Sequence, residues 1–225
     1  LQWEGYRPPM AGKHHTIGLG PIEVAFPNGV FPLGTIHELL CSNTEQATAC
    51  GGFISGLLSV LMKNGGACIW VGLSGNLFPL ALKAFGVEPE RIIFIQLMHD
   101  SDVLWVMEEA LKCAGLAAVI GELREIDFKQ SRRLQLAVEQ SRVTGFVLRN
   151  DSAKAGNTAC AARWKISSLP SESEAGLPGL GFPRWKIELL KTRNGQTGSW
   201  TMEWSNGKFV PALESRLNQK KLMVG

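Results

Sequence analysis

The chain has 225 residues, of which 45% are hydrophobic and 19% charged, values typical of one globular domain with or without a small appendage. No apolar run is long enough for a membrane span and no basic-then-apolar leader opens the chain, so we expect a cytoplasmic protein and leave nucleoid association open. Residues 1–122 carry 6 basic and 11 acidic side chains (net −5), whereas residues 123–225 carry 17 and 9 (net +8). This asymmetry favours nucleic acid or an acidic partner on the basic side.

An irregular lead-in, rich in Gly and Pro, occupies residues 1–34, and strand and helix patterns then alternate. We expect strands at 35–40, 67–71, 91–95, 116–120 and 144–148. We expect helices at 46–62, 77–85, 101–113 and 129–142. Such alternation predicts a three-layer α/β fold, in which helices cover both faces of a mostly parallel sheet.

The last part of the chain changes character. Its strand-like segments are 159–168, 185–191 and 199–204, and an Asn-Gly turn signal stands at 194–195. The sheet should therefore end in an antiparallel hairpin. A polar tail follows, in which a short helix is left open. We divide the chain into the lead-in 1–34, a core domain 35–206 and the tail 207–225.

The five cysteines and four histidines form no metal-binding motif. An odd number of cysteines without C-x-x-C spacing argues against a disulfide framework and a zinc site, so we expect reduced thiols packed as small apolar side chains. No histidine has a second ligand three or four residues away in a helical pattern. We predict neither a metal nor another cofactor.

The loop between the first strand and the first helix is where α/β nucleotide-binding proteins hold phosphate. A working phosphate-binding loop reads G-x-x-x-x-G-K-[ST], because glycines let backbone N–H groups surround the phosphates and the lysine contacts them. The matching positions here are Cys41, Gln46 and Ala47, and only Thr48 fits. Glu45 adds a negative charge, so the loop predicts a loss of nucleotide binding. An ordinary loop of some other α/β protein is the alternative.

The order and spacing of several segments between residues 31 and 204 resemble the RecA superfamily, and most closely its ImuA branch. These segments are FPNGVFPLGTIHE at 26–38, LKAFGV at 82–87, RWKIELLKTRNG at 184–195 and WTMEW at 200–204. The resemblance covers most of the chain, although no single motif is decisive. It implies a RecA-like core and membership of a bacterial, DNA-damage-induced family.

The resemblance also implies that the apparatus of RecA-type ATPases is mostly missing. Ser74 stands where the water-activating acid belongs, and a hydroxyl is a poor general base. Glu122 is the nearest candidate for the magnesium-binding acid, with a structural role as the alternative. The degenerate pocket comprises Cys41, Thr44, Gln46, Ala47, Thr48, Ser74 and Glu122. We expect no enzymatic activity.

In RecA-type proteins the segments after the fourth and fifth strands face DNA, and the corresponding segments here are basic. Together with the closing hairpin they give a candidate surface for DNA or a protein partner: Arg124, Lys129, Arg132, Arg133, Arg149, Lys154, Arg163, Arg184, Lys186, Arg193 and Trp204. Few aromatic residues are interleaved, so base stacking is not indicated. A solvated basic surface, and tryptophans that fill the core, are the alternatives.

The ImuA family is linked to translesion DNA synthesis, where it is thought to act with the polymerase relative ImuB and an alternative replicative-type polymerase. The resemblance thus implies a non-catalytic adaptor that binds an ImuB-like partner, with RecA, DNA and self-association left open and no membrane contact expected. Two alternatives stand beside it. One is an inhibitor of cell division of the SulA type, and the other is an ATPase that works through an unusual loop.

Overall fold

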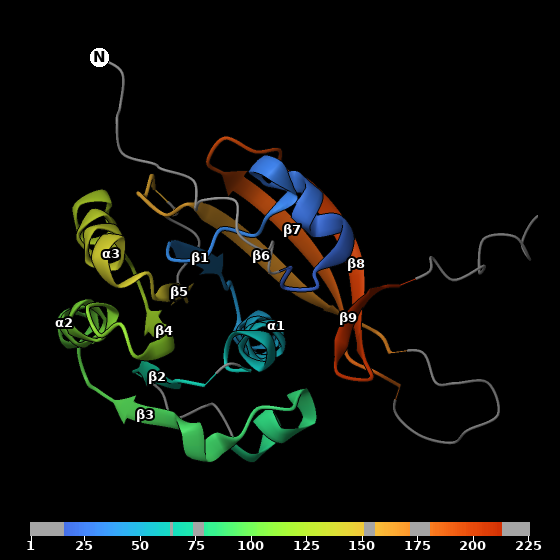
Figure 1. The fold of residues 1–225 in the computed structure, drawn as a ribbon, viewed down its shortest axis with the longest axis horizontal. Coiled ribbons are helices and arrows are strands. Elements are labelled where there is room, and N and C mark those ends of the chain that lie inside the picture. The colour runs from blue at the N-terminus through green and yellow to red at the C-terminus, as the bar shows by residue number, and fades with distance from the viewer. Residues whose placement is uncertain (1–15, 64, 74–78, 151–155, 172–180, 213–225) are drawn as a thin grey trace, which may run out of the picture.

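A computed structural model describes residues 16–63, 65–73, 79–150, 156–171 and 181–212. Within these residues the strands form a nine-stranded sheet in the order β3-β2-β4-β5-β1-β6-β7-β8-β9 (Figure 1). The strands are β1 Ile36–Leu40, β2 Ala67–Gly72, β3 Ile92–Gln96, β4 Leu116–Leu123, β5 Thr144–Arg149, β6 Ala162–Leu169, β7 Arg184–Thr192, β8 Gly198–Ser205 and β9 Lys208–Pro211. The α-helices are α1 Thr44–Leu61, α2 Asp100–Leu111 and α3 Phe128–Ser141.

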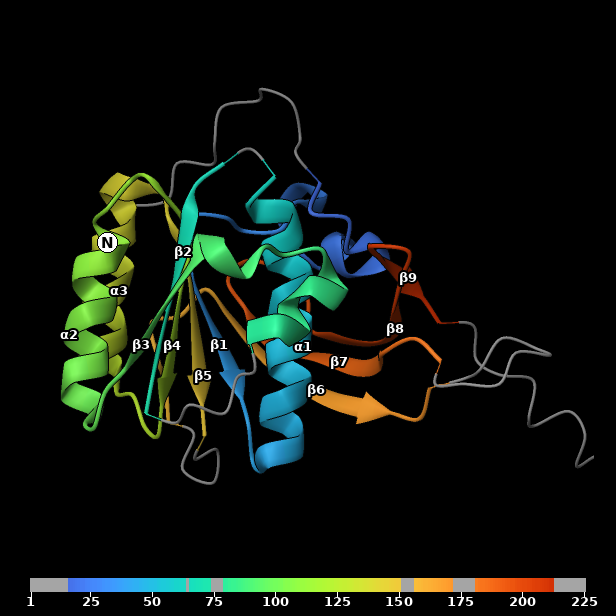
Figure 2. The same cartoon turned by 90° about the horizontal axis from the view of Figure 1, so that it is seen from below.

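The first six strands pair in parallel, and β6 begins an antiparallel run that continues through β7, β8 and β9. The predicted α/β class, with a mostly parallel sheet and an antiparallel ending, is therefore confirmed. The parallel strands are apolar runs because helices cover both of their faces. Figure 2 shows α2 and α3 together on one side of the sheet and α1 on the other.

Side chains alternate between these two faces along each strand. Leu39, Ile120 and Leu148 pack on the α1 side, in an aromatic-rich cluster that also holds Phe53 and Trp164. The neighbouring residues along the strands pack against α2 and α3 in a second cluster, built mainly of Val, Leu and Ile. The two faces therefore differ in side-chain size, and the α1 face holds the bulkier, aromatic side chains.

The strand β9 lies in the segment that the sequence assigned to the polar tail. Ser205 and Lys208 pair across a two-residue turn, in which Asn206 and Gly207 both have positive φ (51° and 72°). Asn-Gly is the preferred pair for such a hairpin turn, so the signal was present in the sequence. The proposed core boundary at residue 206 cuts through this hairpin, and the sheet continues to Pro211.

The part of the lead-in that the structure describes packs into the core. A 3-10 helix at Gly20–Ala25 places Leu19, Ile22 and Phe26 in the cluster on the α1 side. The buried carboxylate of Glu23 accepts the backbone N–H of Ile17 at 2.7 Å, which holds the turn before this helix. Residues 16–34 thus belong to the same packed unit as the sheet.

The helix expected at 77–85 is a 3-10 helix at Pro79–Phe85, and residues 77 and 78 lie outside the described part. The segment ends at Gly86, whose φ of +74° favours glycine. This short helix lies beside α1 (Figure 2). It forms one wall of the cavity described next.

Candidate functional site

The loop between β1 and α1 is closed by its own side chains. Asn43 caps α1 by accepting the N–H of Gln46 on its side-chain oxygen at 2.8 Å. The side-chain oxygen of Gln46 accepts the N–H of Ser42 at 2.9 Å, and the N–H of Ala47 donates to the carbonyl of Asn43 at 3.0 Å. Three backbone N–H groups of this loop are therefore already bonded within the protein. Asn43 is thus the N-cap of α1, and the Gln46 side chain reaches back one residue beyond it, to Ser42.

The remaining predicted pocket residues differ in their exposure. Cys41 is buried, and its Sγ lies 3.4 Å from the Sγ of Cys50 in α1. Ala47, at the position that matches the lysine of the phosphate-binding motif, is half-buried and packs against the core. Thr48 is exposed and donates its hydroxyl to the carbonyl of Thr44 at 3.0 Å. Ser74 lies outside the described residues.

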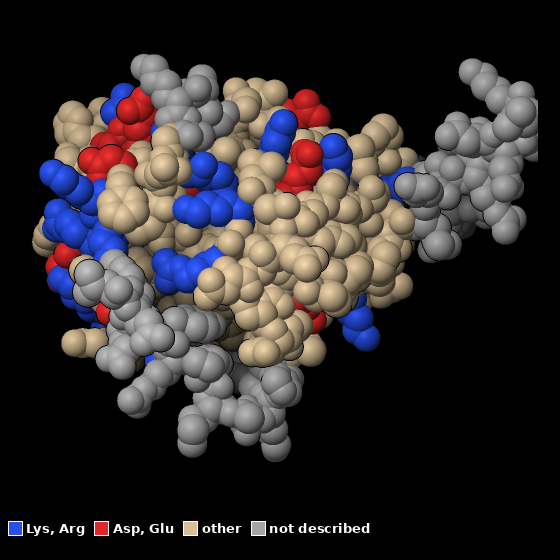
Figure 3. All heavy atoms as spheres, turned by 90° about the horizontal axis from the view of Figure 1, so that it is seen from above, with Lys and Arg blue, Asp and Glu red and all other residues tan. Residues whose placement is uncertain are grey.

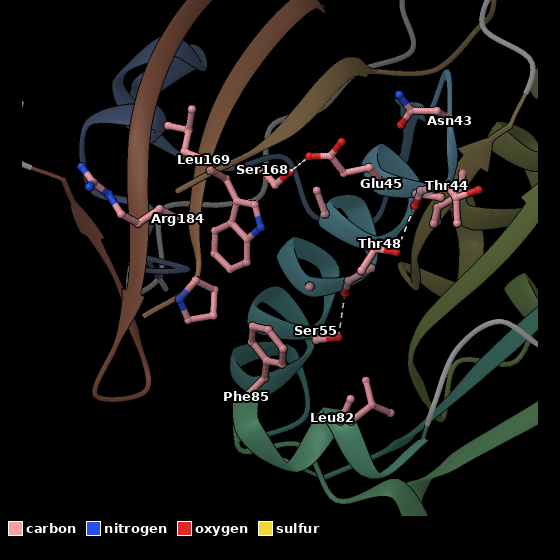
Figure 4. Close-up of a pocket in the computed structure, with 18 of the residues that line it drawn as sticks. Asn43, Thr44, Glu45, Thr48, Ser55, Leu82, Phe85, Ser168, Leu169 and Arg184 are labelled. Atoms are coloured by element: carbon pink, nitrogen blue, oxygen red, sulfur yellow. Dashed lines mark hydrogen bonds between the residues drawn. The ribbon is translucent and has the colours of Figure 1, made fainter. Parts of the chain in front are cut away.

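A cavity of about 920 Å³ lies over the outer side of α1 (Figure 4). Its floor is formed by small residues of the helix, among them Thr48, Gly52 and Ser55. Leu82 and Phe85 form one wall, and the strands β6 and β7 form the other with Ser168, Leu169 and Trp185. The rings of Phe85 and Trp185 stack across the helix, with centroids 6.2 Å apart. Such a size and an apolar lining are usual for ligand sites.

Gly52 allows this arrangement, because a Cβ there would stand 3.1 Å from the Trp185 ring and 3.4 Å from the Phe85 ring. Glycine is a weak helix former, but at this position of α1 the missing side chain lets two aromatic walls approach the helix backbone.

Glu122 lies next to the last residue of β4, on the α1 side of the sheet, and lines the cavity. It is buried and accepts the indole N–H of Trp70 at 2.7 Å. Gly72 of the neighbouring strand provides the space, since a Cβ there would lie 2.8 Å from a Glu122 carboxylate oxygen. The Glu122 carboxylate therefore has a structural contact, the Trp70 indole, and lies in the interior rather than at the surface. Its relation to magnesium stays a prediction.

Four members of the predicted basic surface are buried or nearly so, which corrects that prediction. Arg149 and Arg163 point at the buried carboxylate of Glu38, with nitrogen–oxygen distances of 3.3 and 2.8 Å. Arg184 is buried near Glu203, at 3.7 Å. Trp204 is only 4% exposed and packs on Phe209 in the core. The sequence alone does not indicate that Arg149 of β5 and Arg163 of β6 lie beside Glu38, because this depends on the order of the strands in the sheet.

Other members of that set lie at the surface. Arg124 pairs with Asp100 at 2.8 Å, Arg133 with Glu108 at 2.5 Å, and Arg132 with Glu139 at 3.8 Å. The remaining exposed members are Lys129, Lys186 and Arg193, and Lys154 lies outside the described residues. Figure 3 shows Lys and Arg atoms gathered on the side that carries α3, with Asp and Glu atoms among them. The surface is therefore of mixed charge.

Sequence reasoning missed two features. Trp105 on α2 is 62% exposed, beside a second hollow of about 270 Å³ between α2 and α3. His37 is fully buried, and burial lowers its pKa to about 4. The Nε2–H of His37 donates to the carbonyl of Pro32 at 2.8 Å, and its Nδ1 accepts the indole N–H of Trp164 at 3.3 Å. This histidine is a neutral part of the core.

All five cysteines are free thiols, and Cys113 is exposed while the others are buried. Burial raises the pKa of Cys68 and Cys160, so these thiols stay protonated. Among the described residues, no three His, Cys, Asp or Glu side chains are grouped as metal ligands would be. The helices in the same part of the chain are all too short or too polar to span a bilayer.

Two curated proteins of similar sequence are both named "Protein ImuA" and come from two strains of Caulobacter vibrioides. Each is 34% identical to this chain over 200 residues, which covers 84% of this chain and 82% of the relative. A scan against protein-family models finds no match.

Proposed function

The chain belongs to the ImuA family, and from this premise we propose that it is a non-catalytic, RecA-like accessory protein of error-prone translesion DNA synthesis, which helps to assemble a mutagenic complex by binding an ImuB-like polymerase relative. The single observation that carries the non-catalytic part is the state of the loop after β1. The N–H groups of Ser42, Gln46 and Ala47 are bonded to side-chain or backbone oxygens of the loop itself.

A polyphosphate would have to displace these bonds without a compensating lysine, because Ala47 occupies the lysine position. The carboxylate of Glu45, held by the hydroxyl of Ser168, adds repulsion at the same place. A hydrogen bond to a charged group contributes about 1.5–3 kcal/mol, so loss of the lysine contact together with this repulsion should weaken nucleotide binding about 100-fold or more.

We favour a protein partner over DNA for the surface around α2 and α3. The arginines Arg124 and Arg133 are each paired with a carboxylate there, so neutralising phosphates would require breaking an existing ion pair. Trp105 stands exposed beside Arg133 in the same hollow, and Trp with Arg is a frequent anchor of protein interfaces.

Two measurements test the proposal. Calorimetric titration with ATP and magnesium should give no detectable heat, for the natural chain and for Thr48→Ala alike. Co-purification with an ImuB-like protein should succeed and should persist in Thr48→Ala. Micromolar ATP binding that Thr48→Ala abolishes would overturn the non-catalytic part, and failure to associate with ImuB, RecA or DNA at low salt would overturn the adaptor part.

A double variant, Gln46→Gly with Ala47→Lys, sharpens the first measurement. It restores the two most conspicuous motif positions, while Asn43 continues to cap the helix and Glu45 keeps its charge. We expect ATP affinity to stay below the detection limit in this variant. Tight binding would mean that two residues alone account for the loss.

A further inference from the structure

The cavity over α1 has two carboxylates and much apolar surface on its described lining. Among its described lining residues, several hydroxyl and indole donors are already used inside the protein. Thr48 donates to the carbonyl of Thr44, and Ser55 donates to the carbonyl of Gly51 at 2.7 Å. The hydroxyl of Ser168 donates to Glu45, and the indole of Trp70 donates to Glu122. A ligand rich in acceptors, such as a phosphate, cannot use these four donors without breaking a bond within the protein, whereas a ligand rich in donors finds the carboxylate oxygens of Glu45 and Glu122.

Acidic side chains outnumber basic ones on the described lining of the cavity. Glu122 lies buried at one side, and Glu45 extends from the first turn of α1 toward β6 (Figure 4). The described basic residue on the lining is Arg184, and its Nε is 3.7 Å from the carboxylate of Glu203. Figure 4 shows the Arg184 side chain directed away from α1. The described lining thus carries two carboxylates and one guanidinium group that is turned away, a balance that favours a cation.

The walls suit the stem of a long cationic side chain. Phe85 and Trp185 present stacked rings over Gly52, and Leu82 and Leu169 extend the apolar surface on either side. Arginine and lysine bury their methylene groups against such surface, and a guanidinium group also interacts favourably with aromatic faces. Arginine carries five N–H donors in a fixed plane, which matches carboxylate acceptors.

From this charge complementarity we propose that the cavity over α1 binds an arginine side chain, flanked by apolar residues, from an extended segment of a partner protein. The arginine would meet Glu122 and Glu45, and the apolar neighbours would lie against Phe85, Trp185 and Leu82. The place where related folds hold a nucleotide would then be a peptide-recognition site. The inference rests on the proposed adaptor function, since it gives the chemistry of a partner segment.

The test uses the whole chain, labelled with nitrogen-15 in its tryptophan indoles, and the peptide acetyl-Leu-Phe-Arg-Leu-amide. Two comparison ligands are the same peptide with citrulline, which is nearly isosteric with arginine but uncharged, and ATP with magnesium. The chain has seven tryptophans, and single Trp→Phe variants assign their indole signals. Trp70 and Trp185 line the cavity, whereas the exposed Trp105 lies on the opposite face as an internal control.

The arginine peptide should shift the Trp70 and Trp185 signals and leave Trp105 unchanged, and it should bind about tenfold or more tightly than the citrulline peptide. Glu122→Gln should remove this preference, whereas Glu139→Gln on α3 should preserve it. Thr48→Lys should abolish binding by placing its own ammonium group in the cavity, with Thr48→Met as the control for volume. Retention of the indole spectrum shows that each variant is folded.

Equal binding of the arginine and citrulline peptides, or absence of shifts at Trp70 and Trp185, would overturn the inference. The adaptor proposal fails separately, by loss of co-purification with an ImuB-like partner in the natural chain. The surface at Trp105 can also hold the partner, so co-purification is compared between Trp105→Ala and the double variant Trp105→Ala with Thr48→Lys. Equal co-purification of the two would show that the cavity contributes nothing to docking, and the inference would fall while the adaptor proposal stands.

Discussion

Two buried glutamates, Glu38 of β1 and Glu122 of β4, point to opposite faces of the sheet and have different surroundings. Glu38 is fully buried on the α3 side and accepts hydrogen bonds from Arg149, Arg163 and the hydroxyl of Thr158. Glu122 accepts an indole N–H on the α1 side and lines the cavity. A carboxylate enclosed by two guanidinium groups supports the fold, whereas one that faces a cavity can meet a ligand. Burial of charge alone does not separate these roles, but the surroundings do.

Arg149→Leu gives the largest expected effect and tests the closed character of the Glu38 cluster. Removal of one partner leaves a carboxylate buried with less compensation, so the free energy of unfolding should fall by about 4 kcal/mol. Urea unfolding measures it. Arg132→Leu is the matched control, because its ion pair with Glu139 lies at the surface, and it should cost less than about 1 kcal/mol. Equal losses in the two variants would contradict the assignment of a structural role to the Glu38 cluster.

Trp204→Ala tests how much the aromatic packing on the α1 face of the sheet contributes to stability, compared with the Glu38 cluster on the opposite face. Trp204 packs against Phe85 and Phe209, and its loss leaves a void behind the cavity wall. The free energy of unfolding should fall by about 3 kcal/mol. The exposed Trp105 offers the control, since Trp105→Ala should change stability by no more than about 0.5 kcal/mol. The same thermal or urea denaturation curves decide both.

The free energy of unfolding should depend on pH through His37, the residue before Glu38, whose side chain points to the opposite face of the sheet. Its folded pKa of about 4 lies below the ordinary value of 6.5, because burial disfavours the charged ring. The unfolded chain therefore binds the proton first, and the stability that the neutral ring contributes is present above about pH 6.5 and lost as the pH falls toward 4. Between about pH 8 and about pH 5 the natural chain should lose about 2 kcal/mol more than His37→Gln. Parallel stability curves would show that His37 does not titrate as a buried base.

The helices and strands could be predicted from patterns within single segments of the sequence. The contacts of the buried glutamates could not, because they join side chains from segments that are distant in the chain. The alternation of apolar runs and helices predicted five of the six strands that pair in parallel, because buried parallel strands are continuous apolar runs. The sixth, β6, was predicted as a strand of the antiparallel ending, although it also pairs in parallel with β1. The strand β9 was missed although Asn206-Gly207 signalled its turn, because the polar residues after it outweighed that signal. Nothing local could indicate that Arg163, 125 residues away from Glu38, would bond to it.

The loop between β1 and α1 also has features that the sequence predicts and features that depend on the tertiary fold. The absence of the lysine and glycines of the phosphate-binding motif could be predicted from the sequence directly, because the motif occupies one short, continuous segment. That Gln46 folds back to Ser42, and that Glu45 reaches Ser168 on β6, depends on helix capping and on the sheet order. The cavity walls come from residues 79–85 and from β7, so their convergence on Gly52 is a property of the tertiary fold.

Asn43→Ala gives the smallest expected effect and addresses which part of the loop excludes nucleotide. Loss of the cap should cost about 1 kcal/mol in the free energy of unfolding, and Asn43→Asp, which keeps an acceptor oxygen, should cost much less. ATP binding should stay undetectable in calorimetry with Asn43→Ala, because Ala47 still supplies no charge and Glu45 still repels phosphate. A gain of binding in Asn43→Ala alone would place the exclusion in the cap, and it would mean that the N–H groups at the start of α1 remain competent to hold phosphate once they are released.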